Sequence, residues 1–345
     1  MNEVSDVVNL DALLGWMDDN DLGKGPLDQP ELLTGGTQNF LVKFTRDDRD
    51  YVLRRPPLHL RKNSNETMMR EARVLEALTG SDVPHPGFIA SCRDESILNC
   101  CFYLMEPIDG FNATTGLPDY HRSDPAVRHR MGLSMVEAAI ALGAEDYQAV
   151  GLEGFGKSEG FLDRQVLRWQ AQIESYSELN EWPGPSALPG IATIPKWLTD
   201  NQPESFTPGI MHGDFHLANI MFRFDSPELA AIVDWELCTI GDPLIDLGWI
   251  MAMWPDPAED RPARVEPWDG FPSLDEMILH YSERSDRNVD HLPWYGVLAC
   301  FKLGAILEGT YARACTGLAP VETGDALHEH TIALFNRALR MIGTA

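Results

Sequence analysis

Residues 211–235 constrain the fold most strongly, because they place a polar loop, a turn and a buried strand in a fixed order. The segment reads MHGDFHLANIMFRFDSPELAAIVDW. Residues 230–233 form a short apolar run typical of a buried strand, and the run ends at Asp234. The turn at residues 223–228 separates this run from the preceding one, so we expect an antiparallel pair. Three polar residues in H-x-D-x-x-x-x-N spacing precede the turn, namely His212, Asp214 and Asn219.

This spacing matches the catalytic loop of kinases, in which the Asp accepts the proton of the substrate hydroxyl and the Asn holds Mg²⁺. One tight loop can place a carboxylate at the incoming hydroxyl and an amide oxygen at the metal. We therefore predict Asp214 as the catalytic base and Asn219 as a metal ligand. Asp234 is predicted as a second Mg²⁺ ligand, because a carboxylate at a strand end is a rigidly held hard-oxygen ligand. Trp235–Glu236 replaces the Phe-Gly of the kinase D-F-G motif.

The tetrapeptide YVLR lies where kinases carry V-A-I-K, so we expect the nucleotide grip there. Val52 and Arg54 share one strand face, which would place Val52 against adenine and Arg54 at the α/β-phosphates. Glu71, on a helix predicted over residues 65–79, is placed to pair with Arg54. Arginine does not reproduce the geometry of lysine. Two further cations could therefore share the phosphate contact, namely Lys43 and Arg55.

Two backbone segments complete the predicted nucleotide site. Gly35 and Gly36 join the first two predicted strands and could let N–H groups approach the phosphates, although such a pair is also common in simple turns. Met105 and Glu106 lead from an apolar strand into a hinge near residues 105–110, where the backbone would hydrogen-bond adenine. An ordinary strand end explains the pattern at Met105 and Glu106 equally well.

The wider pattern predicts an α+β, protein-kinase-like bilobal fold with an N-terminal lobe at residues 1–107 and a C-terminal lobe at 108–345. The first lobe should be a small antiparallel sheet with one helix, preceded by an amphipathic helix at residues 6–20. Its strands are expected at residues 32–33, 40–44, 51–54, 88–90 and 100–105. The second lobe should be mainly helical, with helices at residues 125–143, 161–178, 274–284 and 294–314 and Pro-rich connections at 182–208 and 253–272.

Charge and composition exclude several classes of protein. The formal net charge is −26, which argues against nucleic-acid binding because phosphate neutralisation needs a basic face. No apolar run reaches the roughly 20 residues that cross a bilayer. The N-terminus lacks a secretory signal, so we expect a cytoplasmic protein without a membrane partner. The six cysteines lack CxxC spacing and are expected to be reduced. The oligomeric state is not indicated.

The motifs HGDFHLAN, IVDWE and GDPLIDL together resemble the aminoglycoside phosphotransferase/choline kinase superfamily. More narrowly, the chain is similar to a kinase-like branch whose members occur alone in bacteria or fused to acyl-CoA dehydrogenases. Supporting segments include GGTQNF, YVLRRPP, REARVLEAL, FYLMEPIDG and LEGTYARA, which run over about residues 30–315. The resemblance implies ATP and Mg²⁺ as cofactors, with roles for Asp214, Asn219 and Asp234 as above. It also implies that Asp246 holds the catalytic loop or orients the substrate, whereas Asp242 is a structural cap.

The resemblance implies a small-molecule hydroxyl acceptor without fixing which one. The superfamily includes antibiotic, choline and homoserine kinases, and the fused relatives suggest hydroxyacyl-CoA-type acceptors. Such an anionic acceptor would need a local basic patch, which Arg164 and Arg168 could form, although surface ion pairs are the commoner use of such residues. The segment 253–271 could close over the acceptor.

Two other readings compete with an active kinase. A pseudokinase that binds nucleotide without transfer is favoured by Arg54 and by the altered Asp-Trp-Glu sequence. A metal-dependent hydrolase would give a role to His216, which has none in the kinase scheme. Its ligands would be His212, Asp214, His216 and Asp234. In the kinase scheme His212 is a buried supporting residue, and His216 is expected to pack or to line the acceptor site.

Overall fold

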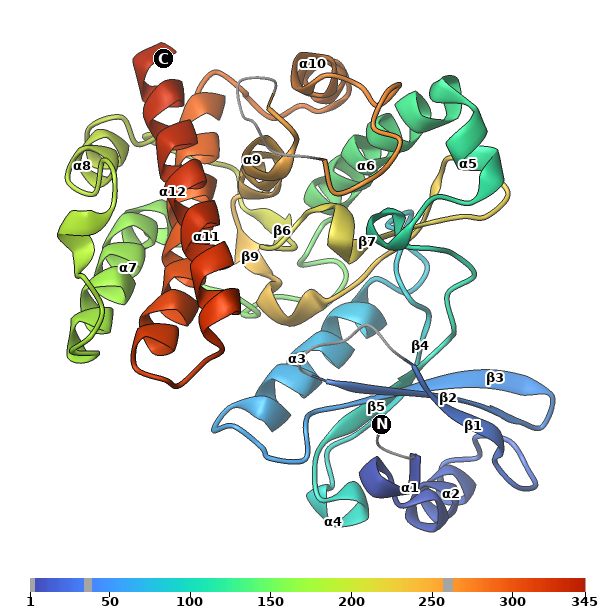
Figure 1. Cartoon of the computed structure of the whole chain (residues 1–345). Helices are drawn as coiled ribbons and strands as arrows, with labels where there is room; N and C mark the ends of the chain where they lie inside the picture. Colours follow the sequence, from blue (N-terminus) through green and yellow to red (C-terminus); the bar gives the residue numbers. More distant parts are fainter. Residues whose placement is uncertain (1–3, 34–38, 257–262, 345) are drawn as a thin grey trace.

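A computed structural model describes residues 4–33, 39–256 and 263–344, and Figure 1 shows the two lobes that they form. The smaller lobe contains a five-stranded antiparallel sheet in the order β1-β2-β3-β5-β4. The larger lobe is mainly helical, as the sequence predicts. The strands of the sheet are β1 (Asp28–Leu33), β2 (Phe40–Arg46), β3 (Arg49–Arg55), β4 (Phe88–Cys92) and β5 (Phe102–Met105).

The two faces of the small sheet have different partners because side chains alternate along each strand. On β3, Tyr51 and Leu53 pack with Leu13 and Met17 of α2 (Leu10–Asp19). The alternate residue Val52 belongs to the other core, which includes residues of α3 (Ser64–Ala77). The N-terminal helices α1 (Val4–Val7) and α2 therefore cover the back of the sheet and leave its front to α3 and the large lobe.

Helix α3 is tied to the large lobe on both sides of Glu71. Arg70 donates to the carbonyls of Phe155 (3.1 Å) and Cys238 (3.3 Å), and its guanidinium lies 4.0 Å from the centre of the Phe155 ring. Arg73 donates to the carbonyl of Gly151 at 2.8 Å. These contacts fix the helix that carries Glu71 relative to the catalytic lobe.

Two short strand pairs carry the predicted catalytic segment. β6 (Gly209–Met211) pairs with β9 (Thr239–Gly241), and β7 (Ile220–Phe222) pairs with β8 (Leu229–Ile232). The predicted antiparallel pair is therefore confirmed, with Ile220 opposite Ile232. The backbone N–H of Val233 donates to the carbonyl of Asn219 at 2.9 Å, which places Asn219 beside the residue that precedes Asp234.

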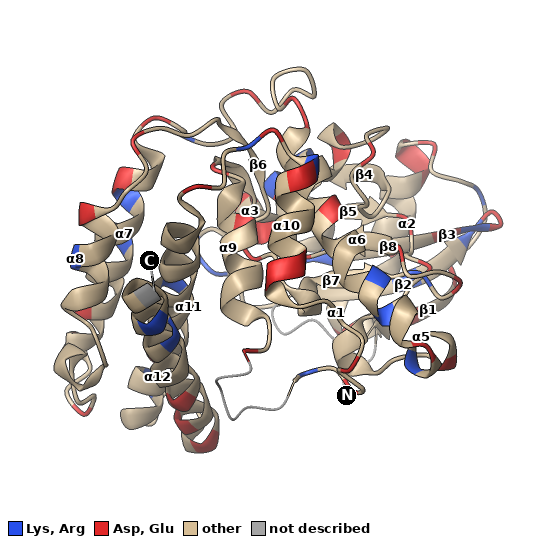
Figure 2. Ribbon diagram, turned by 90° about the horizontal axis from the view of Figure 1, so that it is seen from above, with Lys and Arg blue, Asp and Glu red and all other residues tan. Residues whose placement is uncertain are grey.

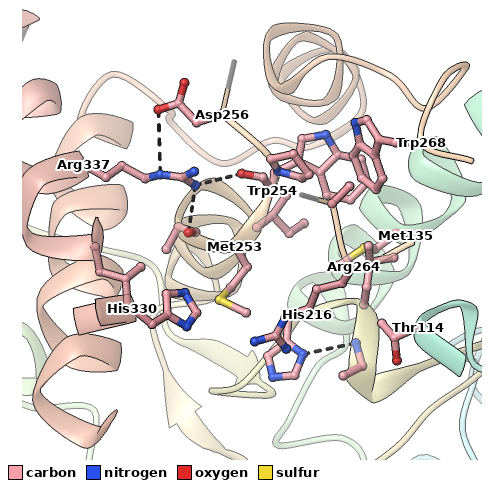
Figure 3. Close-up of a pocket in the computed structure, with 17 residues that line it drawn as sticks. Thr114, Met135, His216, Met253, Trp254, Asp256, Arg264, Trp268, His330 and Arg337 are labelled. Atoms are coloured by element: carbon pink, nitrogen blue, oxygen red, sulfur yellow. Dashed lines mark hydrogen bonds and ion pairs between the residues drawn. The ribbon is translucent and has the colours of Figure 1, made fainter. Parts of the chain in front are cut away.

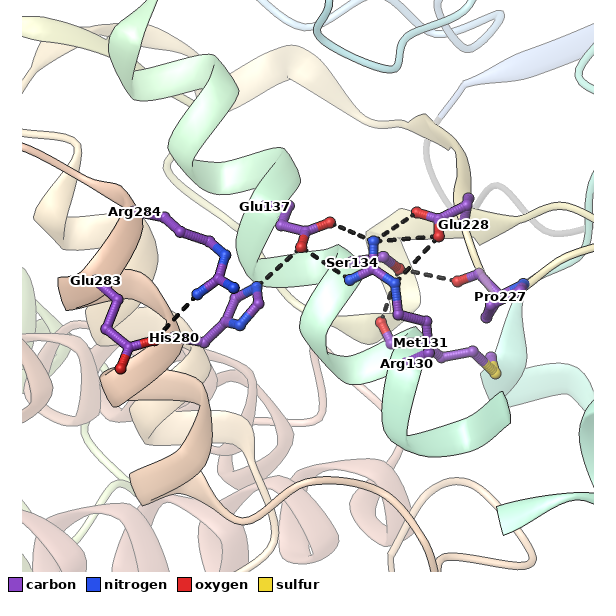
Figure 4. A network of polar contacts seen from close by, with 9 residues as sticks. All are labelled: Arg130, Met131, Ser134, Glu137, Pro227, Glu228, His280, Glu283 and Arg284. Carbon is purple, nitrogen blue, oxygen red and sulfur yellow. Dashed lines mark hydrogen bonds and ion pairs between the residues drawn. The ribbon is translucent and has the colours of Figure 1, made fainter. Parts of the chain in front are cut away.

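The hairpin β7–β8 is anchored to α6 (Pro125–Ala144) by the network in Figure 4. Arg130 contacts the carboxylate of Glu228 at 3.1 Å and that of Glu137 at 2.6 Å. His280, on α10 (Leu274–Arg284), lies 2.9 Å from Glu137. The Ser134 hydroxyl donates to the carbonyl of Pro227 at 2.9 Å. Helices α6 and α10 thus hold the turn of this hairpin. The predicted metal ligands, Asn219 and Asp234, lie at its two ends.

Helices form the remaining core of the large lobe. α9 (Leu244–Met253) is buried on all sides, from Leu244 to Ala252, as expected for a helix that is apolar around its whole circumference. α11 (Leu292–Cys315) packs along both α9 and α12 (Val321–Thr344), and Figure 1 shows α11 and α12 side by side. The other helices of at least five residues are α5 (Asp119–Ser123), α7 (Phe161–Ser175) and α8 (Thr193–Asp200).

The structure corrects the predicted elements at several places. The expected connection at residues 182–208 contains α8, and neither α9 nor α12 was predicted. α9 shows no helical period because its residues are apolar on all sides. α8 was not predicted because it begins next to a proline-rich stretch. α7 ends at Ser175, and β1 begins earlier than expected, at Asp28. Acidic residues occur along α7, α8 and α10 (red in Figure 2), in keeping with the net charge. Among the described helices, none is long and apolar enough to cross a bilayer.

Candidate active site

The loop between β6 and β7 is held by Asp246 of α9. The backbone N–H groups of His212 and Gly213 donate to the two carboxylate oxygens of Asp246 at 2.7 and 2.8 Å. Asp246 is 2% exposed, and burial raises its pKa to about 7. The structure thus places Asp246 against the loop, where it can position the residues that follow Gly213.

His212 links this loop to the end of β8. Its Nε2 lies 3.0 Å from the carbonyl of Val233, and its ring packs edge-on against Trp235 at 5.1 Å between centroids. The side chain is completely buried, which lowers its pKa. A neutral, buried His212 agrees with the predicted supporting role and leaves Asp214 as the polar group of the loop.

Asp214 is oriented by two neighbours. The amide nitrogen of Asn219 donates to the backbone carbonyl and to Oδ2 of Asp214, both at 2.9 Å. Nε2 of His216 lies 3.3 Å from the other oxygen, Oδ1. Nδ1 of His216 accepts from the N–H of Ala218 at 3.2 Å, so the proton of a neutral His216 is on Nε2 and faces Asp214. His216 therefore contacts Asp214, which the sequence did not indicate.

These contacts set the charge of Asp214. Burial favours the neutral acid, but the hydrogen bond from His216 and the nearby cations outweigh it, so the pKa of Asp214 lies below its ordinary value. The carboxylate is consequently ionised at neutral pH. An ionised, partly buried carboxylate with fixed orientation can accept a hydrogen bond from a hydroxyl and later its proton.

The two predicted metal ligands present hard oxygen atoms. The Asn219 amide nitrogen faces Asp214, which leaves its carbonyl oxygen as the group that can face a cation. Asp234 has φ +67°, a left-handed conformation rare for residues other than glycine, and its side chain is 42% exposed. One amide and one carboxylate oxygen are a donor set that suits Mg²⁺, which takes few protein ligands beside phosphates and water.

Arg54 crosses from the small lobe to this metal-ligand pair. Its Nε lies 2.9 Å from Oε2 of Glu71 and its Nη2 lies 2.8 Å from Oδ1 of Asp234. The Tyr103 hydroxyl donates to the same Glu71 oxygen at 3.1 Å. Burial raises the pKa of Glu71, and the charge of Arg54 opposes this effect. The predicted Arg54–Glu71 pair is therefore present, and Arg54 also reaches the predicted metal ligand.

The two alternative cations have other partners. Arg55 is buried on the opposite face of β3 and donates to the carbonyls of Val7 and Pro56. Lys43 lies 3.5 Å from Asp50. Arg55 is thus excluded from the front of the sheet, because successive side chains of a strand point to opposite faces.

At the predicted hinge, the backbone donor of Glu106 is occupied. The N–H of Glu106 donates to the carbonyl of Gly87 at 2.7 Å, and its carboxylate contacts Arg49 at 3.0 Å. Met105 is buried opposite Val52 in the sheet register. Glu106 could therefore meet a base through its carbonyl but not through its N–H. The predicted phosphate loop with Gly35 and Gly36 lies outside the described residues.

A cavity of about 170 Å³ opens beside His216 (Figure 3). Its wall is mostly apolar and aromatic, and Trp254 and Trp268 lie with their ring centroids 4.9 Å apart. Arg264 points toward His216 in Figure 3 and is exposed. The described ends of segment 253–271 thus contribute to the wall, and their closing over an acceptor stays a prediction. Other lining residues include Thr114, Met135, Met253, His330, Leu334 and Arg337.

The charged groups of this cavity are mainly basic. Arg337 donates to the carbonyls of Met251, Ala252 and Trp254, which fixes the chain after α9. The only acidic lining residue described is Asp256, whose carboxylate contacts Arg340 at 2.8 Å. Among the described lining residues, arginines therefore outnumber carboxylates, in contrast to the protein as a whole.

The arginines predicted to form a basic patch are not part of this cavity. Arg164 donates to the carbonyls of Lys157 and Glu159, next to the start of α7. The guanidinium of Arg168 lies 4.9 Å from the ring centre of Trp169. Neither residue lines the cavity. The arginines that do line it are Arg264, which precedes α10, and Arg337 on α12.

Two supporting residues were missed by sequence reasoning. The amide nitrogen of Asn112 donates to the carbonyls of Leu217, Ala218 and Ile220, at 2.7 to 3.1 Å, and so holds the second half of the loop. Lys302, in the middle of α11, is 7% exposed and donates to the carbonyl of Gly213 at 2.7 Å. No local motif marks either residue; a lysine within an apolar helical segment is the one signal that the sequence contains.

The metal-dependent hydrolase finds no support among the described residues. No group of three or more His, Cys, Asp or Glu side chains in this part of the chain is arranged to hold a metal ion. His212 faces the Val233 carbonyl, as described above, so it does not join Asp214 and Asp234 as a ligand. The arrangement instead suits a cation held by two protein oxygens together with phosphates.

Comparison with known proteins identifies this arrangement. Residues 31–276 match the sequence model of the phosphotransferase enzyme family. The chain belongs to this family. Two curated relatives are acyl-CoA dehydrogenase family member 10 of Mus musculus and member 11 of Homo sapiens. They are 30% and 32% identical to this chain over 84% and 82% of its length. The chain spans only 27% and 36% of these relatives.

Solved structures share the fold of this member of the phosphotransferase enzyme family. An aminoglycoside phosphotransferase candidate from Ralstonia eutropha is 28% identical, with a TM-score of 0.78 over 96% of this chain and 99% of its own. The streptomycin–ATP complex of APH(2″)-IIa has a TM-score of 0.58 at 14% identity, over 97% and 99% of the two chains. The second likeness concerns the fold alone.

Proposed function

We propose that this phosphotransferase transfers the γ-phosphoryl group of ATP, with Mg²⁺, to a hydroxyl group of a small molecule. The observation that carries the proposal is the junction of Arg54, Asp234 and the Asp214 loop. Arg54 contacts Asp234 across the lobes, and His212 and the Asn219 backbone tie Val233, the residue before Asp234, to the loop of Asp214. We also propose a boundary between lobes near residues 107–108, with the hinge at 105–110, because strand β5 of the small sheet ends at Met105.

Nucleotide binding would use the front of the small sheet. Val52 and Met105 would contact the base, and the Glu106 carbonyl would accept a hydrogen bond from it. Arg54 already uses Nε and Nη2, so Nη1 would contact the α/β-phosphates. Gly35 and Gly36 stay a prediction for backbone contacts with phosphate. Asn219 and Asp234 would hold Mg²⁺, which neutralises charge on the transferring group.

Asp214 would act as the base at the incoming hydroxyl. Its carboxylate is ionised and held by Asn219 and His216, so it can orient the hydroxyl and accept its proton late in the transfer. The bond between the hydroxyl oxygen and the γ-phosphorus forms as the bond to the β-phosphate oxygen breaks. The protein contributes mainly position and charge neutralisation, which is how phosphoryl transfer is accelerated in general.

The cavity beside His216 is proposed to receive the acceptor. Its aromatic wall suits an apolar body, and Arg264 and His330 suit an anionic group. A polycationic aminoglycoside would meet cations there instead of the carboxylates that it needs, although the fold is that of aminoglycoside kinases. Among the acceptors implied by the resemblance, a hydroxyacyl-type compound fits this lining best. The fused dehydrogenases among the relatives are consistent with such an acceptor.

A catalytically weak pseudokinase is the second candidate. Arginine at position 54 and its contact with Asp234 favour it, because that carboxylate oxygen is engaged before Mg²⁺ arrives. The complete set of Asp214, Asn219 and Asp234 favours an active enzyme.

Six free cysteines, five of them buried, support the proposal that the protein works in the reducing cytoplasm.

The decisive experiment is an ATP-consumption screen over hydroxyacyl-CoAs, aminoglycosides, amino alcohols and sugars. Mass spectrometry should detect the gain of one phosphoryl group on the accepted compound. Asp214→Asn should lower kcat at least about a hundredfold while Mg·ATP still binds in calorimetry. Asp225→Asn, at an exposed turn of the hairpin, is the matched control and should keep full activity. Equal turnover by Asp214→Asn would disprove the assignment, and Mg²⁺-independent ATP binding with no acceptor would favour the pseudokinase.

A further inference from the structure

Lys302 lies beneath the catalytic loop, on a helix that reaches the loop from the far end of the sequence. Its ammonium donates to the carbonyl of Gly213 at 2.7 Å. The N–H of Gly213 donates to Asp246 at 2.8 Å. The residue immediately before Asp214 is therefore held through its N–H by the carboxyl group of Asp246 and through its carbonyl by the ammonium of Lys302.

The Gly213 backbone has little freedom to adopt another conformation. Its φ is +83°, and a Cβ atom at this position would lie 2.7 Å from the carbonyl oxygen of Leu237. The backbone is thus packed closely against the segment that follows Asp234. A small rotation of the Gly213 peptide would redirect Asp214, because the two residues share a peptide bond.

Two tryptophan rings beside Lys302 stabilise its positive charge. The ammonium lies 5.0 Å from the ring centre of Trp249 and 5.6 Å from that of Trp169, distances typical of cation–π contacts. Burying an ammonium is unfavourable, and an apolar residue would pack between two indoles at lower cost in free energy. Stability alone therefore does not account for a lysine here.

The charges around Lys302 connect it to Asp214. Those whose fields reach it are Asp214 in the loop, Asp246 on α9 and Arg168 on α7. Burial lowers the pKa of Lys302 to about 8, so it is mainly protonated at neutral pH. Its positive charge helps to lower the pKa of Asp214, after the contribution of His216.

We propose that Lys302 is a positioning residue that holds the Gly213–Asp214 peptide in the reactive orientation. The inference rests on the proposed function, because Asp214 is a base only in that scheme. Lys302 does not line the acceptor cavity, so it acts through the loop rather than on the substrate.

The test compares Lys302→Met, which removes the charge at similar length, with Lys302→Arg, which retains it. Lys196→Met on α8, where the lysine is 74% exposed, is the matched control. The assay measures phosphate release from Mg·ATP with water as acceptor, so that no acceptor needs to be known. We expect Lys302→Met to lower kcat about ten- to a hundredfold with little change in the KM for ATP. Lys302→Arg should recover part of the loss.

A double variant separates positioning from a general loss of structure. In an Asp214→Asn background, Lys302→Met should cause little further loss of kcat, since both changes act on one group. A full additional loss in the double variant would overturn the inference, as would an unchanged kcat in Lys302→Met.

Hydrogen–deuterium exchange tests the inference without relying on turnover. Residues 209–219 should exchange faster in Lys302→Met than in the wild type, whereas the β1–β3 sheet should not change. Equal protection of residues 209–219 would overturn the positioning role. Should Lys302→Met fail to fold, Lys302→Gln takes its place as the neutral variant. Failure of the wild type to bind Mg·ATP would instead refute the proposed function, and the exchange comparison would then decide the role of Lys302 alone.

Discussion

The guanidinium of Arg54 lies 2.8 Å from the carboxylate of Asp234, although 180 residues separate them in the chain. The same side chain contacts Glu71 through a different nitrogen. A lysine ammonium is a single point charge, whereas the planar guanidinium has several donors in fixed directions. Arg54 can therefore join a small-lobe helix to a large-lobe metal ligand and still have a nitrogen available for phosphate.

This relationship predicts the effect of removing Arg54. Arg54→Ala should weaken Mg·ATP binding about ten- to a hundredfold, as expected for loss of a charge-assisted hydrogen bond of about 1.5–3 kcal/mol. Calorimetric titration with Mg·ATP measures the change. Arg284→Ala, at a half-exposed position on α10, is the control and should bind normally. Tighter Mg·ATP binding by Arg54→Ala would instead identify the Arg54–Asp234 contact as an inhibitory one.

The basic lining of the cavity predicts how acceptors are distinguished. Arg264→Glu should lower kcat/KM for an anionic acceptor about ten- to a hundredfold, because an attractive charge becomes repulsive. A neutral acceptor of similar shape should be affected much less, and KM for ATP should not change. Steady-state kinetics with both acceptors gives the ratio, and Arg284→Glu serves as the control for altered net charge. Equal losses for charged and neutral acceptors would contradict charge recognition by Arg264.

The network of Arg130 and Glu137 predicts a pH dependence of stability. Burial raises the pKa of Glu137, but hydrogen bonds from Arg130 and His280 outweigh burial and leave it below its ordinary 4.5. A carboxylate with a lowered pKa stabilises the folded state above about pH 4.5, and this contribution is lost as the pH falls through the folded-state pKa.

Arg130→Met should therefore lower the free energy of unfolding by about 1 kcal/mol at neutral pH, the scale of a partly exposed ion pair. The difference from the wild type should shrink below about pH 4.5, where Glu137 becomes protonated. Urea titrations at several pH values measure it, with Arg284→Met as the control. A difference that is constant across this pH range would show that Arg130 acts through packing alone.

Sequence reasoning found the groups that share a local pattern. Asp214, Asn219 and Asp234 lie in one continuous segment that includes the β7–β8 hairpin, so their spacing can be seen in the sequence. Val52, Arg54 and Glu71 are also near one another in sequence, and period-two alternation places the first two on one face. The helix α9 was missed because a helix that is apolar on all sides shows no distinct apolar face. The helix α12 was not predicted either, although its apolar residues recur with a helical period.

The sequence by itself determined the bilobal fold and the identity of the groups predicted to carry the chemistry, because these depend on local periodicity and on short fixed spacings. The tertiary structure decided how those groups are held and what lies beside them. Lys302 and Asn112 reach the catalytic loop from distant elements, and His216 gains its contact with Asp214. The cavity is built from helices and connections far apart in the chain. Such contacts result from the packing of whole elements, so no spacing in the sequence encodes them.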